Sequence, residues 1–205
     1  MEDATIITCC GEEISHYLDA AARLRIEVFR EYPYLYDGTA CYESDYLRSY
    51  ARSRDSVFVC ALVAGEVVGV STALPLKDAD ASFQRPFQEA GMTVEDVYYL
   101  GESVLLPAYR GRGIGHAFFD HREQRARELG YRSTSFCSVL RPDDHPHRPP
   151  GYRDHQTFWT QRGYQPTGLI ATLPWQQIDA EEEVMNRLEF WMRSEQTRPA
   201  TMRRE

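Results

Sequence analysis

The sequence predicts an α/β protein, because runs of β-branched residues alternate with runs whose apolar residues recur at helical spacing. Two β-branched runs, 57–63 and 67–75, are separated only by Ala64-Gly65-Glu66, a short turn typical of a hairpin. A further strand-like run, 97–106, leads through a glycine-spaced turn into a polar helical run that ends at Gly130. A hairpin and a strand–turn–helix unit in one chain indicate a sheet with helices packed against it.

The other elements continue this alternation along the chain. Ser15 is expected to cap a first helix whose apolar residues extend to Phe29, while 141–150 is a proline-punctuated loop. The segment 77–95 is polar and irregular, so we expect a connection with one possible helical turn at 82–90. The run 183–193 fits a strand or a helix from its spacing alone. Further strands are expected at 5–8, 131–139 and 167–175, and further helices at 42–52 and 154–162.

Length and composition indicate one folded unit. A chain of 205 residues with 42% hydrophobic content can bury one substantial core, so we expect one domain over residues 1–195 and a disordered tail at 196–205. The net charge of −8 argues against a nucleic-acid partner, which normally requires a basic face. Without a signal-peptide pattern or an apolar run near the ~20 residues of a membrane span, we expect a cytoplasmic protein that does not bind membranes. Five cysteines without a CxxC pair argue against a disulfide framework.

The glycine-spaced turn has the features of an anion site. It reads Arg110-Gly111-Arg112-Gly113-Ile114-Gly115-His116 and opens the helical run. A helix N-terminus leaves backbone N–H groups unpaired and carries partial positive charge, and glycines allow a phosphate to approach those groups closely. Two arginines add charged donors. The turn therefore predicts a phosphate-binding site, with a ligand-free turn as the alternative.

Two commoner phosphate-binding motifs do not fit these residues. A P-loop needs Lys and then Ser or Thr after its last glycine, whereas Gly115 is followed by His116 and Ala117. The dinucleotide fingerprint needs Gly or Ala three residues after its second glycine, and from Gly113 that position is His116. The strand-like run 131–139 also lacks an acidic residue for a ribose. A nucleotide triphosphatase or a Rossmann dehydrogenase is therefore not expected.

The spacing Arg-x-x-Gly-x-Gly, preceded by Leu-Leu-Pro-Ala-Tyr, resembles the acetyl-CoA signature of the GCN5-related N-acetyltransferase (GNAT) family. The resemblance holds residue by residue from Ser103 to Gly130 and, by the order of elements, from about Ile14 to Trp175. It implies a GNAT-like acyl-CoA N-acyltransferase fold, with a central mixed, mostly antiparallel sheet of about seven strands flanked by helices. In that order of elements the run 183–193 is the seventh strand.

The resemblance also implies acetyl-CoA as co-substrate and no metal. The strand end Val104-Leu105-Leu106-Pro107 stands where the family hydrogen-bonds pantetheine, and cofactor binding is assigned here to Ser103, Val104 and Leu105. A backbone N–H near Val104 would point at the thioester carbonyl. The turn stands where the family holds the pyrophosphate of coenzyme A, which assigns cofactor binding to Arg110, Gly111, Arg112, Gly113, Ile114, Gly115 and His116.

Glu102 is the candidate general base. Acetyl transfer to an amine needs an unprotonated nucleophile, stabilisation of the oxyanion and a proton for the leaving thiolate. Glu102 alternates with Leu100, Val104 and Leu106 on one face of the expected strand. Burial among apolar side chains would make its carboxylate a stronger base. A glutamate paired with an arginine or lying at a solvated edge is the alternative.

The proton donor departs from the family pattern. Aligning Gly163-Tyr164 with the Gly-Phe usual in the family places Trp159 where a catalytic Tyr often stands, and Tyr152 where an Asn often stands. An indole N–H is not a workable acid. Tyr152 is therefore the candidate acid, unless the thiolate leaves without help. Trp159 packs either on the pantetheine arm or in the core.

Two segments are candidate surfaces for the acceptor: the aromatic run 29–36 and the loop that carries Asp143, Asp144, His145 and His147. The ligand spacing of this loop fits no metal template. We expect a small-molecule amine or a protein amine as acceptor, and a homodimer is left open. The rival functions are transfer of a longer acyl group and a non-catalytic acyl-CoA sensor or interaction module.

Overall fold

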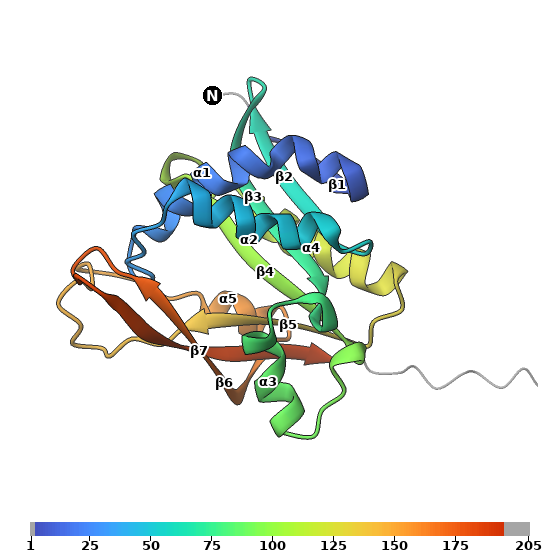
Figure 1. Cartoon of the computed structure of the whole chain (residues 1–205). Coiled ribbons are helices and arrows are strands. Elements are labelled where there is room, and N and C mark those ends of the chain that lie inside the picture. The colour runs from blue at the N-terminus through green and yellow to red at the C-terminus, as the bar shows by residue number, and fades with distance from the viewer. Residues whose placement is uncertain (1–2, 195–205) are drawn as a thin grey trace, which may run out of the picture.

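The computed structural model describes residues 3–194, which form a twisted sheet with helices packed on both faces (Figure 1). The sheet has seven strands in the order β1-β2-β3-β4-β5-β7-β6. The strands are β1 (Thr5–Cys10), β2 (Val57–Val63), β3 (Glu66–Pro75), β4 (Val97–Leu105), β5 (Ser133–Val139), β6 (Gln165–Gln176) and β7 (Glu183–Ser194). The helices are α1 (Leu18–Phe29), α2 (Ala40–Arg52), α3 (Ala81–Glu89), α4 (Ile114–Glu128) and α5 (Gln156–Gln161), with short 3-10 helices η1 (Gly11–Tyr17), η2 (Leu76–Asp78), η3 (Val94–Asp96) and η4 (Pro107–Tyr109).

The two central strands β4 and β5 separate part-way along their length. All other neighbouring strands pair antiparallel, whereas β4 and β5 run parallel and pair only over residues 97–99 and 133–135. Both strands continue past this point, β4 to Leu105 and β5 to Val139, so their C-terminal halves diverge (Figure 1). The diverging ends lie beside the turn that leads into α4, which makes this the region of the sheet where backbone groups can serve a ligand.

A β-bulge shifts the side chains of β4 in the same region. Between Leu100 and Ser103, three steps along β4 match two steps along β3. Leu100 therefore packs into the core on the α4 side of the sheet, whereas Val104 packs into the core on the α1 and α2 side. The expectation that Leu100, Glu102 and Val104 share one face is wrong for this reason: a bulge reverses the alternation on which it rested.

Arg122 of α4 braces the bulged strand. Its Nη1 donates to the carbonyl oxygens of Thr72 and Glu102 at 3.2 and 3.3 Å, and its Nη2 donates to Ser103 Oγ at 2.8 Å. The side chain is 1% exposed, and burial lowers the pKa of Arg122 to about 10, which leaves the guanidinium charged at neutral pH. Because the bulge removes carbonyl groups from the regular ladder, this buried donor satisfies groups that would otherwise lack a partner.

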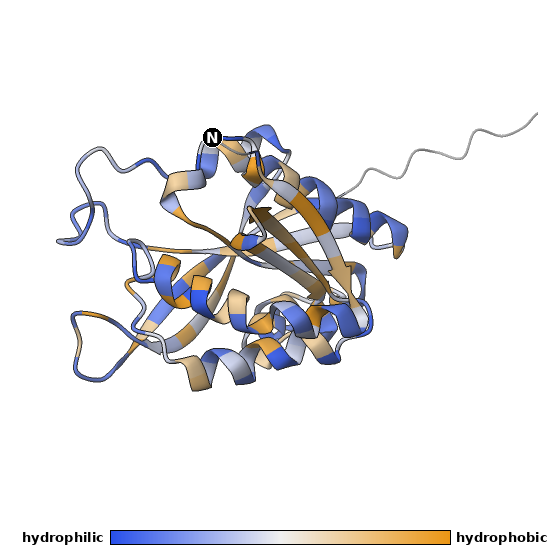
Figure 2. Cartoon of the chain, turned by 90° about the horizontal axis from the view of Figure 1, so that it is seen from above, coloured by the Kyte–Doolittle hydropathy of each residue, from blue (hydrophilic) through white to orange (hydrophobic). Residues whose placement is uncertain are grey.

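The sheet lies between two hydrophobic cores, one on each face. The helices α1, α2 and α3 cover one face, and α4 and α5 cover the other. In Figure 2, hydrophobic residues run along several strands, and the helices carry hydrophobic and hydrophilic residues in alternation, as expected of helices that bury one side. Leu24, Leu47 and Phe87 are fully buried on the first face, and Phe118 and Tyr164 on the second. Burial on both faces is what holds a partly parallel sheet together.

The fold class is confirmed, and two local expectations change. The possible helical turn at 82–90 is a full helix, α3, because Phe83 and Phe87 bury one of its faces and Asp80 caps it by accepting from the N–H of Ser82. Ser15 caps nothing: its hydroxyl donates to Glu12 O inside η1. The run 183–193 is the strand β7, and the expected tail at 196–205 lies outside the described residues. Across residues 3–194, no helix combines the length and apolarity needed to cross a membrane.

Candidate active site

The glycine turn presents backbone donors at the start of α4. Gly111 and Gly113 adopt φ angles of +74° and +81°, a left-handed conformation that favours glycine. A Cβ built on Gly111, Gly113 or Gly115 would meet nothing within 4 Å, so the space above this backbone is open. The first turn of a helix has no internal acceptor for its N–H groups, among them those of Ile114 and Gly115. Donors, dipole and open space at one place fit a phosphate group.

The two arginines of the turn bind protein groups. Arg110 Nε donates to Leu105 O at 3.1 Å, and its Nη1 pairs with Glu31 Oε2 at 2.9 Å. Arg112 Nη2 donates to Ala108 O at 2.7 Å. These contacts hold the turn against β4 and against the segment between α1 and α2. A guanidinium has five N–H donors, so binding of an anion by Arg110 and Arg112, together with the backbone donors, stays a prediction.

At the end of β4, the N–H of Leu105, and not that of Val104, faces the side from which β5 has separated. The N–H of Leu106 donates to Val68 O at 3.0 Å across the β3–β4 pair. Successive N–H groups of a strand point to opposite sides, so the N–H of Val104 also points to β3, while those of Ser103 and Leu105 point toward the side where β5 diverges. The thioester contact expected near Val104 stays a prediction, and the neighbouring N–H groups of Ser103 and Leu105 are the ones that face the open side of β4.

Glu102 lies in a buried polar cluster. It is 6% exposed, and its Oε2 forms an ion pair with Arg25 Nη1 at 2.7 Å and accepts a hydrogen bond from the Tyr46 hydroxyl at 3.4 Å. Arg25 also pairs through Nε with Glu43, which is fully buried. Burial alone would lower the pKa of Arg25, but Glu102, Tyr46 and Glu43 together hold it well above its usual value. The apolar surroundings expected for Glu102 are replaced by an arginine partner, the alternative that the sequence left open.

Arg25 and Glu43 were missed from the sequence, although a signal for both exists. Arg25 lies three residues after Ala22 and four before Phe29, on the apolar face of α1. Glu43 lies four residues before Leu47, on the apolar face of α2. A charged residue at a core position of each of two neighbouring helices indicates a buried ion pair, because an unpaired buried charge is too costly.

Tyr34 and Cys137 lie near Glu102 where β4 and β5 separate. Cys137 Sγ is 3.1 Å from the Tyr99 hydroxyl, a contact that crosses from β5 to β4. Burial raises the pKa of Cys137 to about 12, so its thiol stays protonated and is no nucleophile at neutral pH. Burial also raises the pKa of Tyr34, and Cys137, Glu102 and Tyr152 act on it in the same direction. Tyr34 is thus a second phenol beside the candidate base, besides the expected Tyr152.

Tyr152 and Trp159 occupy different surroundings. The Tyr152 ring meets Tyr32 edge-on with centroids 4.7 Å apart, and burial raises the pKa of its phenol, which is therefore protonated at neutral pH. Trp159 packs in the core against Phe136 and Trp191, at centroid distances of 5.0 and 5.2 Å. The core alternative is the one that the structure supports for Trp159, and the role of Tyr152 stays a prediction.

The segment between α1 and α2 is anchored to two distant parts of the chain. Arg141 Nε donates to Pro33 O at 2.8 Å and its Nη2 to Tyr34 O at 3.1 Å, while Trp175 Nε1 donates to the same Tyr34 oxygen at 3.1 Å. Tyr36 forms a bridge with Gln177, between the two strands of the β6–β7 hairpin. Through Arg141, the aromatic run is joined to the loop 141–150, and both segments are expected near the acceptor.

In the loop 141–150, acidic and histidine side chains pair with neighbouring residues and do not gather into a common site. Asp143 pairs with Arg148 at 2.5 Å, and His147 Nε2 lies 3.1 Å from Asp179 Oδ2. Burial, Arg141 and His147 lower the pKa of His145. Within residues 3–194, no three side chains of His, Cys, Asp or Glu are grouped so that they could hold a metal ion.

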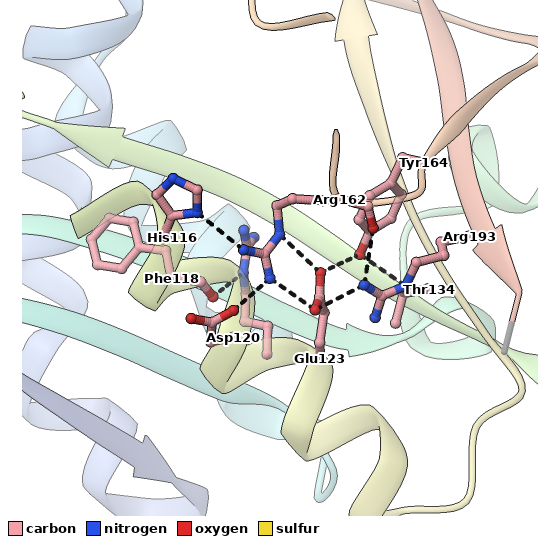
Figure 3. A network of polar contacts seen from close by, with 9 residues as sticks. His116, Phe118, Asp120, Glu123, Thr134, Arg162, Tyr164 and Arg193 are labelled. Carbon is pink, nitrogen blue, oxygen red and sulfur yellow. Dashed lines mark hydrogen bonds and ion pairs between the residues drawn. The ribbon is translucent and has the colours of Figure 1, made fainter. Parts of the chain in front are cut away.

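An ion-pair network fixes α4 behind the glycine turn (Figure 3). Glu123 is 4% exposed and pairs with Arg162 at 2.9 Å and with Arg193 at 3.0 Å, while the Tyr164 hydroxyl donates to it at 3.1 Å. Arg162 Nη1 also lies 3.4 Å from His116 Nδ1. The network joins α4 to the end of α5 and to β7, and it reaches the first turn of the helix through His116.

Diverging central strands, a bulged β4 and a glycine turn at a helix N-terminus define an acetyltransferase-like site, and sequence comparison agrees. Residues 21–149 match the acetyltransferase (GNAT) family, so the chain belongs to this family. A search of curated proteins gives no significant match.

Solved structures of similar fold share little sequence with this chain. A ribosomal-protein-alanine N-acetyltransferase from Brucella melitensis is 14% identical with a TM-score of 0.61, covering 92% of this chain and 99% of its own. The protein yncA from Salmonella typhimurium, whose structure contains its cofactor acetyl-CoA, is 12% identical with a TM-score of 0.60, covering 95% and 96%. A polyamine N-acetyltransferase from Drosophila melanogaster is 14% identical with a TM-score of 0.58, covering 93% and 100%. At these identities the likeness establishes the fold.

Proposed function

We propose that this protein transfers the acetyl group of acetyl-CoA to a primary amine, without a covalent enzyme intermediate. The observation that carries the proposal is the separation of β4 from β5 beside the open glycine turn of α4. Residues 110–116 would hold the pyrophosphate through backbone N–H groups, and the strand end 103–105 would hydrogen-bond pantetheine. When bound, acetyl-CoA supplies the thioester, and the remaining chemistry falls to the side chains of the chain.

The proposed reaction balances with two proton transfers. The amine nitrogen forms a bond to the acetyl carbonyl carbon, the C–S bond breaks, and coenzyme A leaves as a thiolate. Glu102 takes the proton that the nitrogen loses, directly or through water, and the N–H of Leu105 stabilises the oxyanion. Tyr152 or Tyr34 gives a proton to the thiolate, since burial keeps both phenols protonated at neutral pH. The products are an amide and free coenzyme A.

The surroundings of Glu102 support an amine that arrives as a cation and releases one proton to water before the neutral nitrogen attacks the thioester. Two buried carboxylates, Glu43 and Glu102, share the single guanidinium of Arg25, and the face of the Tyr46 ring lies 4.3 Å from that guanidinium. These two carboxylates carry one negative charge more than Arg25, while Arg122 binds backbone carbonyls and Ser103 from the α4 side of β4. The side of β4 that faces α1 and α2 therefore attracts a positive acceptor. A small-molecule amine and a protein amine both meet this requirement.

A thiol-release assay tests the proposal. The purified protein is given acetyl-CoA and a panel of amines that includes diamines, aromatic amines and peptides with free amino groups. Faster release of coenzyme A with one class of amine, together with mass spectrometry of the acetylated product, supports the function. Release that no amine accelerates contradicts it, and binding of coenzyme A by calorimetry in that case favours a non-catalytic sensor. Repeating the assay with longer acyl-CoA donors tests the acyl-chain length.

A further inference from the structure

Two carboxylates compete for one buried arginine beside β4. Arg25 Nη1 binds Glu102 at 2.7 Å, and its Nε binds Glu43. Glu43 is fully buried, Glu102 is 6% exposed, and Oε1 of each carboxylate is buried without a hydrogen-bond partner. A carboxylate paired alone with an arginine is a weak base, because the positive charge stabilises its ionised form. A second carboxylate on the same arginine counteracts this effect.

We propose that Glu43 is a positioning residue that shares Arg25 with Glu102 and so keeps Arg25 from neutralising the Glu102 carboxylate. This inference rests on the proposed function, in which Glu102 accepts the proton of the amine. The Nε contact to Glu43 fixes the plane of the guanidinium, so that Nη1 meets only Oε2 of Glu102. The negative charge of Glu43 offsets the positive charge of Arg25 at Glu102. Glu43 thus acts on the reaction through Arg25 rather than by touching the substrate.

Other charged and titratable groups around Glu102 are the same in every variant of the test. They come from the helices and strands packed against β4 and from the segment after α1, and their effect on Glu102 is a constant background. They are Tyr46 and Tyr50 of α2, Arg122 of α4, Cys137 of β5 and Tyr34.

Substitutions at Glu43 and Arg25 should move the titration of Glu102 in opposite directions. Glu43→Gln keeps the size of the side chain and an acceptor for Arg25 but removes the negative charge, so the acid limb of the pH profile of kcat/KM should move to lower pH. Arg25→Gln removes the cation and should move the midpoint of this limb to higher pH. Opposite shifts cannot come from a general loosening of the site, which would act in one direction for both variants.

The experiment follows Glu102 by carbon-13 NMR of protein labelled at the glutamate carboxyl carbon, with the Glu102 signal assigned by its loss in Glu102→Gln. The same variants are examined by the pH dependence of kcat/KM with acetyl-CoA and an amine. Glu43→Asp, which keeps the charge, should restore the wild-type midpoint. Asp45→Asn removes an exposed carboxylate from the same helix, where Asp45 pairs with Arg48, and should leave the midpoint unchanged.

A shift to lower pH in Glu43→Gln, with restoration by Glu43→Asp, supports the proposal. An unchanged midpoint in Glu43→Gln, or shifts of the same sign in both variants, overturns it. If circular dichroism shows that Arg25→Gln does not fold, Glu43→Gln and Glu43→Asp decide alone. A midpoint that shifts as expected in a protein that acetylates no amine supports the electrostatic arrangement and contradicts the proposed transferase function instead.

Discussion

Arg110 and Glu31 form an ion pair of 2.9 Å that connects the glycine turn to the segment following α1. Both side chains are 45% exposed, so the pair adds about 0.5 kcal/mol or less to the free energy of folding. Its position has a larger consequence, because Glu31 places a negative charge next to a site proposed to bind a pyrophosphate. The carboxylate that anchors the turn also opposes the approach of an anion.

Glu31→Gln is therefore expected to strengthen coenzyme A binding by about twofold, and more at low ionic strength, because the opposing charge is lost. Isothermal titration calorimetry at two salt concentrations measures the effect. Asp37→Asn is the matched control: Asp37 belongs to the same segment and pairs with Arg30 instead of the turn. Weaker binding in Glu31→Gln would mean that the pair orients Arg110 for the ligand rather than competing with it.

Gly113→Ala should weaken coenzyme A binding by about tenfold, or about 1.4 kcal/mol. The methyl group enters the open space in which the phosphate is proposed to lie, and φ of +81° is strained for alanine by about 1 kcal/mol. Gly91→Ala separates the two effects, because Gly91 has φ of +71° and open space but lies after α3. Both variants should lose similar thermal stability, and only Gly113→Ala should lose affinity. Equal affinities in the two variants would contradict the anion site.

Local patterns of the sequence are sufficient to predict the order of the helices and strands and the position of the glycine turn. The hairpin at 57–75 and the strand–turn–helix at 97–130 are signalled by residues close together in the chain. The β4 bulge could not be predicted in this way, because it depends on the register with β3 and on the buried guanidinium of Arg122. The same limit applies to Glu102: its arginine partner comes from a helix 77 positions away, a contact set by tertiary packing.

Charged residues on the apolar face of a predicted helix are the signal from which buried ion pairs could have been predicted. Arg25, Glu43, Arg122 and Glu123 all occupy positions where their helices turn toward the core. Sequence position shows that such residues need partners, since buried ions are costly alone. It does not show which partner each one takes, because that depends on how the helices cross the sheet.

Cys137→Ala should make the stability of the protein less sensitive to alkaline pH. Burial raises the pKa of Cys137 from 9.0 to about 12, so the folded state holds a proton that the unfolded state releases above pH 9. The resulting stabilisation is complete below pH 9 and is lost as the pH rises toward 12. The wild-type Tm should fall more steeply than that of Cys137→Ala between pH 8 and about 10.5. Cys41→Ala, at an exposed position, should retain the wild-type slope; equal slopes in all three proteins would refute the prediction.

Tyr152→Phe should lower kcat by at least about tenfold if Tyr152 donates the proton to the leaving thiolate. Its phenol is held protonated by burial, and phenylalanine keeps the edge-on contact with Tyr32. Tyr32→Phe is the matched control, since it keeps the same ring contact and should retain kcat. Tyr34→Phe tests the second phenol: a loss in this variant alone would assign the proton to Tyr34, and full activity in both would indicate that the thiolate leaves unassisted.

Glu123→Gln should destabilise the protein by about 3 kcal/mol, because it leaves Arg162 and Arg193 without their shared buried anion. Urea unfolding measures the loss, and Asp120→Asn is the control, since Asp120 pairs with the same Arg162 but its side chain is 64% exposed. The network also reaches the turn, through the contact between Arg162 and His116. We therefore expect Glu123→Gln to raise the KM for acetyl-CoA more than it lowers kcat, while Asp120→Asn changes neither. A stability loss with an unchanged KM would show that the network supports the fold without positioning the first turn of α4.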